Sequence, residues 1–371
     1  MRNIFIALLI ALLHVACTKK TDDGFVINGS LSGQSDGVEV FLFDLQKGRD
    51  IQKSILKDGK FRFYGRAEGI EKFMVHDATF QSYKTVWLEN STIQMEVLNA
   101  DYESASISGS EIQKEGELWE ELITPLYKKR EQLSKRLENE EQSGDSIKSR
   151  LSKEIADIDK EITEENHDFI KVHSDFKLAS LLLFENKEIF GKEITRVLFK
   201  NLKADVRTNY WGEKLDLYLN NSFELAVGDI MPDIVLPDTS GQSRSIESFK
   251  GNYVLLEFWE SACHSCIDEN AVLRTVYRDY NSQGFEIYAV SLDKEKSNWQ
   301  ETLERDSVSW LTVSDLKGLN GDVAIRFEIE YLPLNYLIDP NGLIISKNIR
   351  GNALIEKLHD LYSKSNKDSQ N

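Results

Sequence analysis

Hydrophobic and polar residues alternate with a period of two from Phe25 to about Gly109. Seven strand-length runs in this stretch are rich in Val, Ile, Phe and Thr, and turn-forming residues such as glycine separate them. The runs are residues 25–31, 38–45, 60–67, 71–78, 84–90, 92–98 and 104–110. Short strands with turn signals at this spacing predict an antiparallel β-sandwich-like domain over residues 25–110.

The period changes at Glu111, where apolar residues begin to recur every three, four or seven positions among Lys and Glu. This spacing predicts amphipathic helices. The first helix carries Trp119, Leu122, Leu126, Leu133 and Leu137, and the second carries Ile147, Leu151, Ile155, Ile158, Ile162 and Phe169. Gly144 between them is a helix stop, and Asp145 or Ser146 is the next cap. We expect residues 111–222 to form an antiparallel helical hairpin followed by further helices.

The last part of the chain, residues 223–371, alternates strand and helix patterns. Residues 254–258 and 287–291 are apolar without alternation, which is typical of strands that are buried on both faces. With the intervening helices they predict a central, mostly parallel sheet. A DPNG turn at 339–342 predicts a final antiparallel strand pair. The fold class is therefore multi-domain, with a β-sandwich-like domain, a helical hairpin region and a C-terminal α/β domain.

Composition supports this division. The chain has 371 residues, of which 41% are hydrophobic and 10% aromatic, so two or three domains can each bury a core. The formal net charge is −17. Nucleic acids and anionic lipid headgroups require a basic surface, so this charge argues against both as partners.

The first seventeen residues differ from the rest of the chain. Arg2 precedes an apolar run from Ile4 to Leu13, which is too short to span a bilayer as a helix. A short apolar run behind a positive residue is typical of a signal peptide, which we expect at residues 1–17. No later stretch approaches the ~18 uninterrupted apolar residues of a membrane-spanning helix.

The signal peptide ends at Cys17, after Val15 and Ala16. This ending resembles the lipobox of bacterial lipoproteins, although His14 stands where Leu is usual. The resemblance implies that Cys17 is acylated and that the polar residues 18–24 are a spacer. An uncleaved N-terminal anchor and soluble secretion are the alternatives.

The other two of the three cysteines are Cys263 and Cys266. Structural zinc normally needs four Cys or His ligands, and the sequence has no second C-x-x-C, so no metal site is expected. A structural disulfide that closes so short a loop would stabilise the fold little. A redox dithiol is therefore the favoured interpretation, with a static disulfide and zinc as alternatives.

The position of the pair before a predicted helix, from His264 to about Asn281, favours the same chemistry. A thiol at a helix N-terminus faces unpaired N–H groups and the positive end of the helix dipole, which favour the thiolate. Cys263 is therefore the expected nucleophile. Cys266, one turn later, is expected to close the disulfide and to resolve a mixed disulfide with a substrate.

The segment LLEFWESACHSCIDEN, residues 255–270, resembles the active site of the thioredoxin superfamily, where a buried strand ends in a C-x-x-C that opens a helix. The segments GFEIYAVSLD, LPLNYLIDPNGLI and ALIEKLHDL extend the resemblance. The whole layout resembles TlpA-like, membrane-tethered thiol–disulfide oxidoreductases of bacterial envelopes, including lipoproteins with a preceding β-rich domain of unknown function. The resemblance implies a thioredoxin-like fold for residues 223–371 and no cofactor besides the Cys263–Cys266 disulfide.

Two glutamates match acidic positions of the superfamily or of its membrane-tethered branch. Glu257, six residues before Cys263, matches a buried acid that exchanges a proton with Cys266, and burial would raise its pKa. Glu269 matches an acid of the membrane-tethered reductases. The alternatives are a glutamate at the sheet edge for Glu257 and a solvated helix residue for Glu269. Trp259 is expected to pack beside the dithiol, with an ordinary core position as the alternative.

The segment before the last hairpin is expected to bind substrate. Pro333 matches the superfamily's cis-proline, and Leu332 before it would offer backbone groups to a substrate strand. This expectation rests on the resemblance alone, because an X-Pro bond is trans by default.

The residues between the cysteines depart from the superfamily pattern. Ala262 and Ser265 stand where Trp and Pro are common. A protonated His264 would stabilise the thiolate and make the disulfide more oxidising, whereas Glu257, Glu260, Asp268 and Glu269 act in the opposite direction. His264 and Ser265 are therefore expected to tune the redox potential, whose value the sequence leaves open.

We expect an envelope thiol–disulfide oxidoreductase, tethered through Cys17 with its thioredoxin-like domain in the periplasm. It would act on protein disulfides, as a reductase rather than an oxidase, and receive electrons from an upstream protein. Two alternatives remain. One is a scaffold or binding lipoprotein whose N-terminal domains bind a partner. The other is a thiol peroxidase, which is disfavoured because Leu256 and Glu260 occupy the Pro and Thr positions of the P-x-x-x-T-x-x-C frame.

Overall fold

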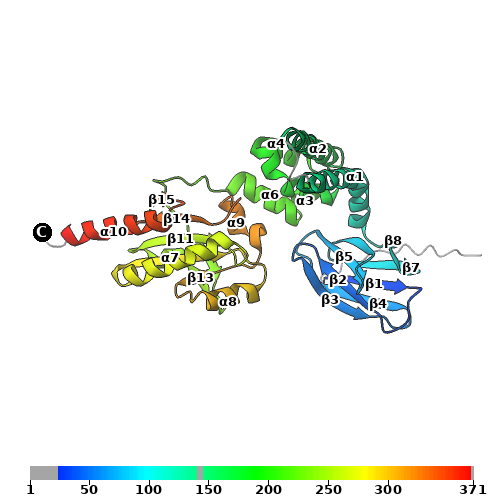
Figure 1. Cartoon of the computed structure of the whole chain (residues 1–371), viewed down its shortest axis with the longest axis horizontal. Helices are drawn as coiled ribbons and strands as arrows, with labels where there is room; N and C mark the ends of the chain where they lie inside the picture. Colours follow the sequence, from blue (N-terminus) through cyan, green and yellow to red (C-terminus); the bar gives the residue numbers. More distant parts are fainter. Residues whose placement is uncertain (1–23, 140–144, 369–371) are drawn as a thin grey trace, which may run out of the picture. The chain divides into compact units, whose positions relative to one another are not determined.

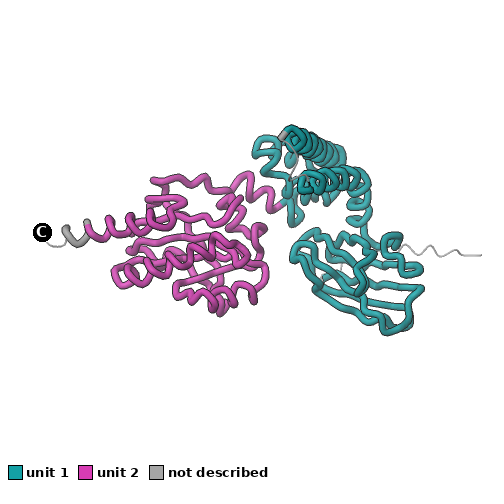
Figure 2. Tube along the Cα trace, viewed as in Figure 1, with its two compact units in different colours: residues 1–212 teal, residues 213–371 magenta. Residues whose placement is uncertain are grey.

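The computed structural model describes residues 24–139 and 145–368. The chain divides into two compact units, residues 1–212 and 213–371, which Figure 2 colours separately. The predicted signal peptide, the predicted lipidation site Cys17 and the predicted helix stop Gly144 lie outside the described residues. Among the helices that the structure describes, none combines the length and the apolar character that a membrane crossing requires.

The described part of unit 1 begins with eight strands in two four-stranded sheets, ordered β4-β1-β7-β8 and β3-β2-β5-β6 (Figure 1). The strands are β1 (Phe25–Leu31), β2 (Glu39–Asp44), β3 (Arg49–Ile55), β4 (Lys60–Gly65), β5 (Glu71–Asp77), β6 (Tyr83–Leu88), β7 (Thr92–Leu98) and β8 (Asp101–Ser108). The predicted β-rich fold is confirmed, but its wholly antiparallel pairing is wrong, because β1 and β7 are parallel. A long connection joins these two strands, so no tight hairpin turn forces them to be antiparallel.

One core is shared by the two sheets and follows the alternation in the sequence. Ile27 and Ile93 from the first sheet and Val40, Leu42 and Val75 from the second are fully buried in it. Burial of each such side chain stabilises the fold by about 1.5–3 kcal/mol.

The sequence pattern missed strand β3, which lies at an edge of the second sheet. Its sequence is RDIQKSI, and each of its side chains is exposed or only partly buried. A strand without a buried face has no alternation to detect.

The helical hairpin predicted after the β-rich domain is present. The helices are α1 (Glu111–Asn139), α2 (Asp145–Val172), α3 (Lys177–Glu185), α4 (Lys187–Asn201), α5 (Ala204–Arg207) and α6 (Tyr210–Asn221). Trp119 Nε1 donates to Asn166 Oδ1 at 2.9 Å, and Arg130 pairs with Asp159. The later residue of α1 contacts the earlier residue of α2, so the two helices are antiparallel.

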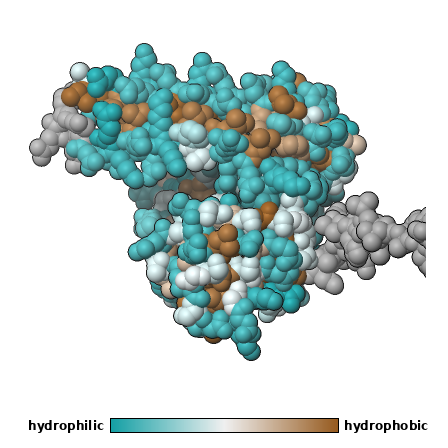
Figure 3. Space-filling view, turned by 90° about the vertical axis from the view of Figure 1, so that its right-hand side faces the viewer, coloured by the Kyte–Doolittle hydropathy of each residue, from teal (hydrophilic) through white to brown (hydrophobic). Residues whose placement is uncertain are grey.

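A recess lies between the second sheet and α1, below the helices in the view of unit 1 in Figure 3. It has a volume of about 510 Å³. On its wall, the Lys72 ammonium lies 4.7 Å from the centre of the Trp87 ring and 2.7 Å from Glu120 Oε1. Other lining residues are Tyr83, Lys84, Trp119, Tyr127 and Lys128. Charged and aromatic side chains therefore join the sheet to the helix.

Unit 2 contains the thioredoxin-like α/β fold. Its elements are β9 (Val235–Pro237), β10 (Ser243–Ser245), β11 (Tyr253–Trp259), α7 (His264–Tyr280), β12 (Phe285–Ser291), α8 (Lys296–Arg305), β13 (Leu311–Val313), α9 (Asp322–Arg326), β14 (Leu334–Ile338), β15 (Ile344–Lys347) and α10 (Gly351–Asp368). The central sheet has the order β13-β12-β11-β14-β15. β11, β12 and β13 are parallel, whereas β14 and β15 are antiparallel to their neighbours, so the sheet is mixed and not mostly parallel as predicted.

The two faces of this sheet bury separate cores, and the alternation along β11 decides which side chain enters which core. Leu256 and Phe258 belong to one core. Leu255 and Trp259 belong to the other, which also holds Cys266 of α7 and residues of α10. Glu257 lies between Leu255 and Trp259 on the same face, so its carboxyl group is directed toward the α7 side of the sheet.

We expect Gly116→Ala in α1 to destabilise unit 1. Glycine to alanine in a helix normally stabilises a protein by about 1 kcal/mol. At Gly116, however, an added Cβ would lie 2.2 Å from the buried Trp87 ring. Thermal unfolding should show a loss of about 1–3 kcal/mol, the typical range for overpacking. Glu121→Ala on the exposed side of α1 is the control, and an unchanged Gly116→Ala variant would contradict the close packing of Trp87 on α1.

Candidate active site

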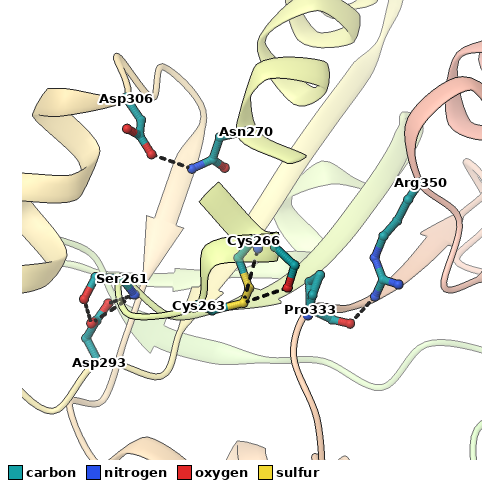
Figure 4. The surroundings of a disulfide bond; sticks show 9 residues. Ser261, Cys263, Cys266, Asn270, Asp293, Asp306, Pro333 and Arg350 are labelled. Carbon is teal, nitrogen blue, oxygen red and sulfur yellow. Dashed lines mark hydrogen bonds between the residues drawn. A yellow bond between two sulfur atoms is a disulfide. The ribbon is translucent and has the colours of Figure 1, made fainter. Parts of the chain in front are cut away.

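The two cysteines of unit 2 form a disulfide at the point where β11 gives way to α7. Cys263 is the N-cap residue of α7, and its Sγ accepts the Cys266 N–H at 3.2 Å (Figure 4). Cys263 is partly exposed, whereas Cys266 is buried. A helix N-terminus favours negative charge, so a thiolate on Cys263 would be stabilised by the same N–H group.

The two residues between the cysteines are exposed. Ser265 Oγ lies 3.4 Å from Cys263 Sγ, within hydrogen-bonding distance of a sulfur atom. A hydroxyl group at this position can donate to a thiolate on Cys263. His264 is the first residue of α7.

The carboxyl group of Glu257 lies inside the unit, with 3% of the residue exposed. β11 is the central strand of the sheet, which rules out the alternative of a glutamate at the sheet edge. Burial raises the pKa of Glu257, and the charge of Glu269 adds a smaller increase, whereas a hydrogen bond from Asn335 and the charge of Arg350 lower it. The net result is a pKa of about 8. Glu257 Oε2 has no hydrogen-bond partner among the described residues.

Trp259 ends the same strand and packs in the core that contains Cys266. It is 4% exposed, and its indole nitrogen has no hydrogen-bond partner in the part of the chain that the structure describes. Trp259 is therefore a core residue, and the core that contains it also contains Cys266.

The Leu332–Pro333 peptide bond is cis, the isomer that the superfamily resemblance implies. Figure 4 shows Pro333 beside the disulfide, and the guanidinium of Arg350 donates to the Pro333 carbonyl. Leu332 is partly buried against both cores of the unit, whereas the preceding Tyr331 is 59% exposed.

Glu269 is not a solvated helix residue. Its Oε1 accepts the Gly351 N–H at 2.9 Å, and Gly351 is the first residue of α10. Glu269 thus joins α7 to the N-terminus of α10, where a helix dipole favours a negative charge.

Sequence reasoning missed several polar residues around the dithiol. Asp293, 2% exposed, accepts hydrogen bonds from the Ser261 N–H at 3.2 Å, from the Ser261 hydroxyl, and from the Ser291 hydroxyl at 2.7 Å. These contacts fix the loop between β11 and Cys263. The position of Asp293 directly after the apolar run of β12 is the signal that could have identified it, because the C-terminal ends of β11 and β12 lie side by side.

Arg350 and Asn335 were also missed. The Asn335 side chain donates to the Ile349 carbonyl and accepts the Ile349 N–H, both at 2.9 Å, and so holds the segment that carries Arg350. No sequence spacing links these residues to the C-x-x-C, because only folding brings β14 and the start of α10 beside β11. In the described residues there is no group of three or more His, Cys, Asp or Glu that could hold a metal ion.

Comparison with known proteins agrees with this geometry. Residues 227–347 match the AhpC/TSA family, and residues 25–115 match a domain of unknown function, DUF4369. The thiol-disulfide oxidoreductase ResA of Geobacillus kaustophilus is 30% identical over 158 residues, which are 43% of this chain and 84% of that protein. ResA of Geobacillus thermodenitrificans is 32% identical over 41% of this chain and 80% of that protein.

The chain belongs to the ResA family of thiol–disulfide oxidoreductases. It is an oxidoreductase with a thioredoxin-like domain and a cysteine redox centre. The thioredoxin domain of a thiol-disulfide oxidoreductase from Bacteroides vulgatus is a similar solved structure, 35% identical over 37% of this chain and 99% of that chain, with a TM-score of 0.36. The ResA relatives match less than half of this chain.

We expect Glu257→Gln to be more stable than the natural protein at high pH. The folded-state pKa of Glu257 lies above its ordinary value of 4.5, so as the pH rises the unfolded chain loses this proton first. The stability of the natural protein should therefore fall between about pH 4.5 and pH 8, by an amount on the order of a few kcal/mol. Glu257→Gln has no ionisable group at this position, so its stability should not fall for this reason in the same pH range.

Calorimetric unfolding of both proteins across this pH range measures the difference. The difference should be small below about pH 4.5 and should level off above about pH 8. Glu301→Gln, at an exposed position of α8, is the control. A difference that does not depend on pH would show that the buried carboxyl group does not titrate as described.

Proposed function

We propose that this protein is a membrane-tethered oxidoreductase of the cell envelope that reduces disulfides in other proteins. The observation that carries the proposal is the combination of a disulfide capping α7 and a buried carboxyl group on the same face of the sheet. Electrons would reach the disulfide from an upstream protein dithiol. The tether would be the lipidated Cys17, and the thioredoxin-like domain would lie in the periplasm.

The reaction begins with the reduced dithiol. The Cys263 thiolate attacks one sulfur of a substrate disulfide, which forms a mixed disulfide and releases the other sulfur as a thiolate. Cys266 then loses its proton and attacks Cys263 Sγ. The second substrate sulfur leaves as a thiolate, and the Cys263–Cys266 disulfide forms. The substrate gains two electrons, and the dithiol loses two.

Glu257 is the proposed acceptor of the Cys266 proton. Burial raises the pKa of Glu257 to about 8, close to the ordinary thiol value of about 8.5. A proton moves with little free-energy cost between groups of matched pKa, so Glu257 can take the proton in one half of the cycle and return it in the other. An exposed carboxyl group, with its ordinary pKa near 4.5, would be a much weaker base.

The cis-proline segment is the proposed binding site for the substrate strand. Leu332 would offer its backbone N–H and C=O to an extended peptide, which is how a substrate adds to an exposed strand. Tyr331, 59% exposed and adjacent in sequence, gives this segment an aromatic side chain for contact with the substrate. Trp259 would pack in the core beside Cys266 and so help to hold the dithiol in place.

The charged and polar groups around the dithiol act on its reduction potential in both directions. Negative charge at Glu269 and Asp293 destabilises a thiolate on Cys263, which makes the reduced dithiol a stronger reductant. A protonated His264 and the Ser265 hydroxyl at 3.4 Å would act in the opposite direction. We therefore assign His264 and Ser265 the role of tuning the potential.

We expect Cys266→Ser to accumulate a mixed disulfide through Cys263. The variant can make the first attack but lacks the thiol that resolves the product. Mass spectrometry after mixing the reduced variant with a disulfide-containing protein should detect the adduct, and Cys263→Ser should form none. If Cys266→Ser forms no adduct, the exchange mechanism is wrong.

We expect Glu257→Gln to slow the resolution of the mixed disulfide by about 100-fold near neutral pH, the typical contribution of a general base. The attack by Cys263 should change much less, because that sulfur is activated by the N-terminus of α7. Stopped-flow tryptophan fluorescence can separate the two phases. Equal slowing of both phases would contradict the assignment of Glu257 to Cys266.

A further inference from the structure

Arg350 lies between β15 and α10, and its guanidinium donates to the carbonyl oxygen of Pro333 (Figure 4). The side chain therefore holds the cis-proline segment from the side of α10. The residue is partly buried, and its Nε has no hydrogen-bond partner among the residues that the structure describes. A buried polar atom without a partner is costly, so Arg350 has an unused donor inside the unit.

Glu257 is placed near this arginine by the β11–β14 pairing. It is the register partner of Asn335, whose side chain bonds both backbone groups of Ile349, the residue before Arg350. Glu257 Oε2 is also buried without a partner among the described residues. The positive charge of Arg350 acts on this carboxyl group and lowers its pKa against the effect of burial. The unit thus contains an unpaired donor on a cation and an unpaired acceptor on a buried acid, and Asn335 connects the segments that carry them.

Other groups that act on Glu257 come from two elements. Glu269 of α7 raises its pKa, and the Asn335 side chain of β14 donates a hydrogen bond to it. Cys266 of α7 is buried in the core on the same face of the sheet. Arg350 is the only cation among the groups that shift the Glu257 pKa in the described structure. The guanidinium that favours an ionised Glu257 is therefore the same group that donates a hydrogen bond to the Pro333 carbonyl.

We propose that Arg350 is a positioning residue that joins the substrate-binding cis-proline segment to the proton acceptor of the dithiol. This inference rests on the proposed function. Before the proton transfer, the guanidinium stabilises the Glu257 carboxylate. After Glu257 has taken the proton of Cys266, that attraction is lost, and the hydrogen bond to Pro333 remains. Arg350 thereby contacts the segment where the substrate docks and responds to the protonation of Glu257, so the two events are coupled through its guanidinium.

Two substitutions separate the charge from the hydrogen bond. Arg350→Gln removes the charge, so the titration midpoint of Glu257 should move to higher pH. Arg350→Lys keeps the charge but loses the planar donor group, so the midpoint should stay close to that of the natural protein. Both variants should weaken the hold on Pro333 and raise the KM for a disulfide peptide several-fold. Arg274→Gln is the matched control, because Arg274 also donates to a backbone carbonyl of this unit, that of Asp306.

The midpoint can be measured without any turnover. In the oxidised full chain, labelled with carbon-13 at glutamate carboxyl groups, the Glu257 resonance is identified by its loss in Glu257→Gln. Its titration is then compared across the natural protein and the three arginine variants. The pH profile of mixed-disulfide resolution and the KM for the peptide are measured in parallel.

An unchanged midpoint in Arg350→Gln, or an equal shift in Arg274→Gln, would overturn the inference. If Arg350→Gln does not fold, Arg350→Lys decides: a raised KM with an unchanged midpoint supports the role, and a natural KM overturns it. Failure of the proposed function is a separate outcome, in which the natural protein exchanges no disulfide with the peptide. The carboxyl titration would still report whether Arg350 acts on Glu257.

Discussion

The burial of one carboxyl group, that of Glu257, organises the chemistry of unit 2. An ionised carboxylate in a protein interior is costly unless it is paired, so its surroundings must either neutralise it or supply compensating charge. Here both occur. Burial favours the protonated acid, while the Asn335 amide and the Arg350 guanidinium favour the carboxylate. Burial is the larger effect, so the pKa of Glu257 is raised to about 8, close to that of a thiol.

This raised pKa depends on which face of β11 the side chain takes. Alternation along the strand gives Leu255, Glu257 and Trp259 to the face that packs against α7 and α10, and Cys266 enters the same core. A shift of one residue in the register of β11 would turn Glu257 to the opposite core and remove the acid from the dithiol. The apolar residues of the strand therefore fix the position of Glu257 as well as the fold.

The site is assembled from segments that are far apart in the chain. β11 and the start of α7 bring the acid and the disulfide, the end of β12 brings Asp293, and the residues before β14 and α10 bring Pro333 and Arg350. Hydrogen bonds between these segments give the dithiol loop and the cis-proline segment defined positions. The β-rich region of unit 1 has a core of its own.

Local patterns in the sequence were sufficient to determine much of this protein. Period-two alternation predicted the β-rich domain, and helical spacing predicted α1 and α2. The C-x-x-C after an apolar strand predicted the redox centre, because strand, cysteine pair and helix are continuous in sequence. The pattern failed at β3, where an edge strand buries no face, and at the β1–β7 pairing, where partners distant in sequence leave no local signal.

Only the tertiary structure decided what surrounds the dithiol. The partners of Glu257, the hydrogen bonds of Asp293 to Ser261 and the contact of Arg350 with Pro333 all join residues from different elements. The same holds for Glu269, which a sequence cannot distinguish from a solvated helix residue until α10 covers it. The residue types therefore predicted a redox dithiol. The packing determined the raised pKa of Glu257, because burial and charge depend on neighbours in three dimensions.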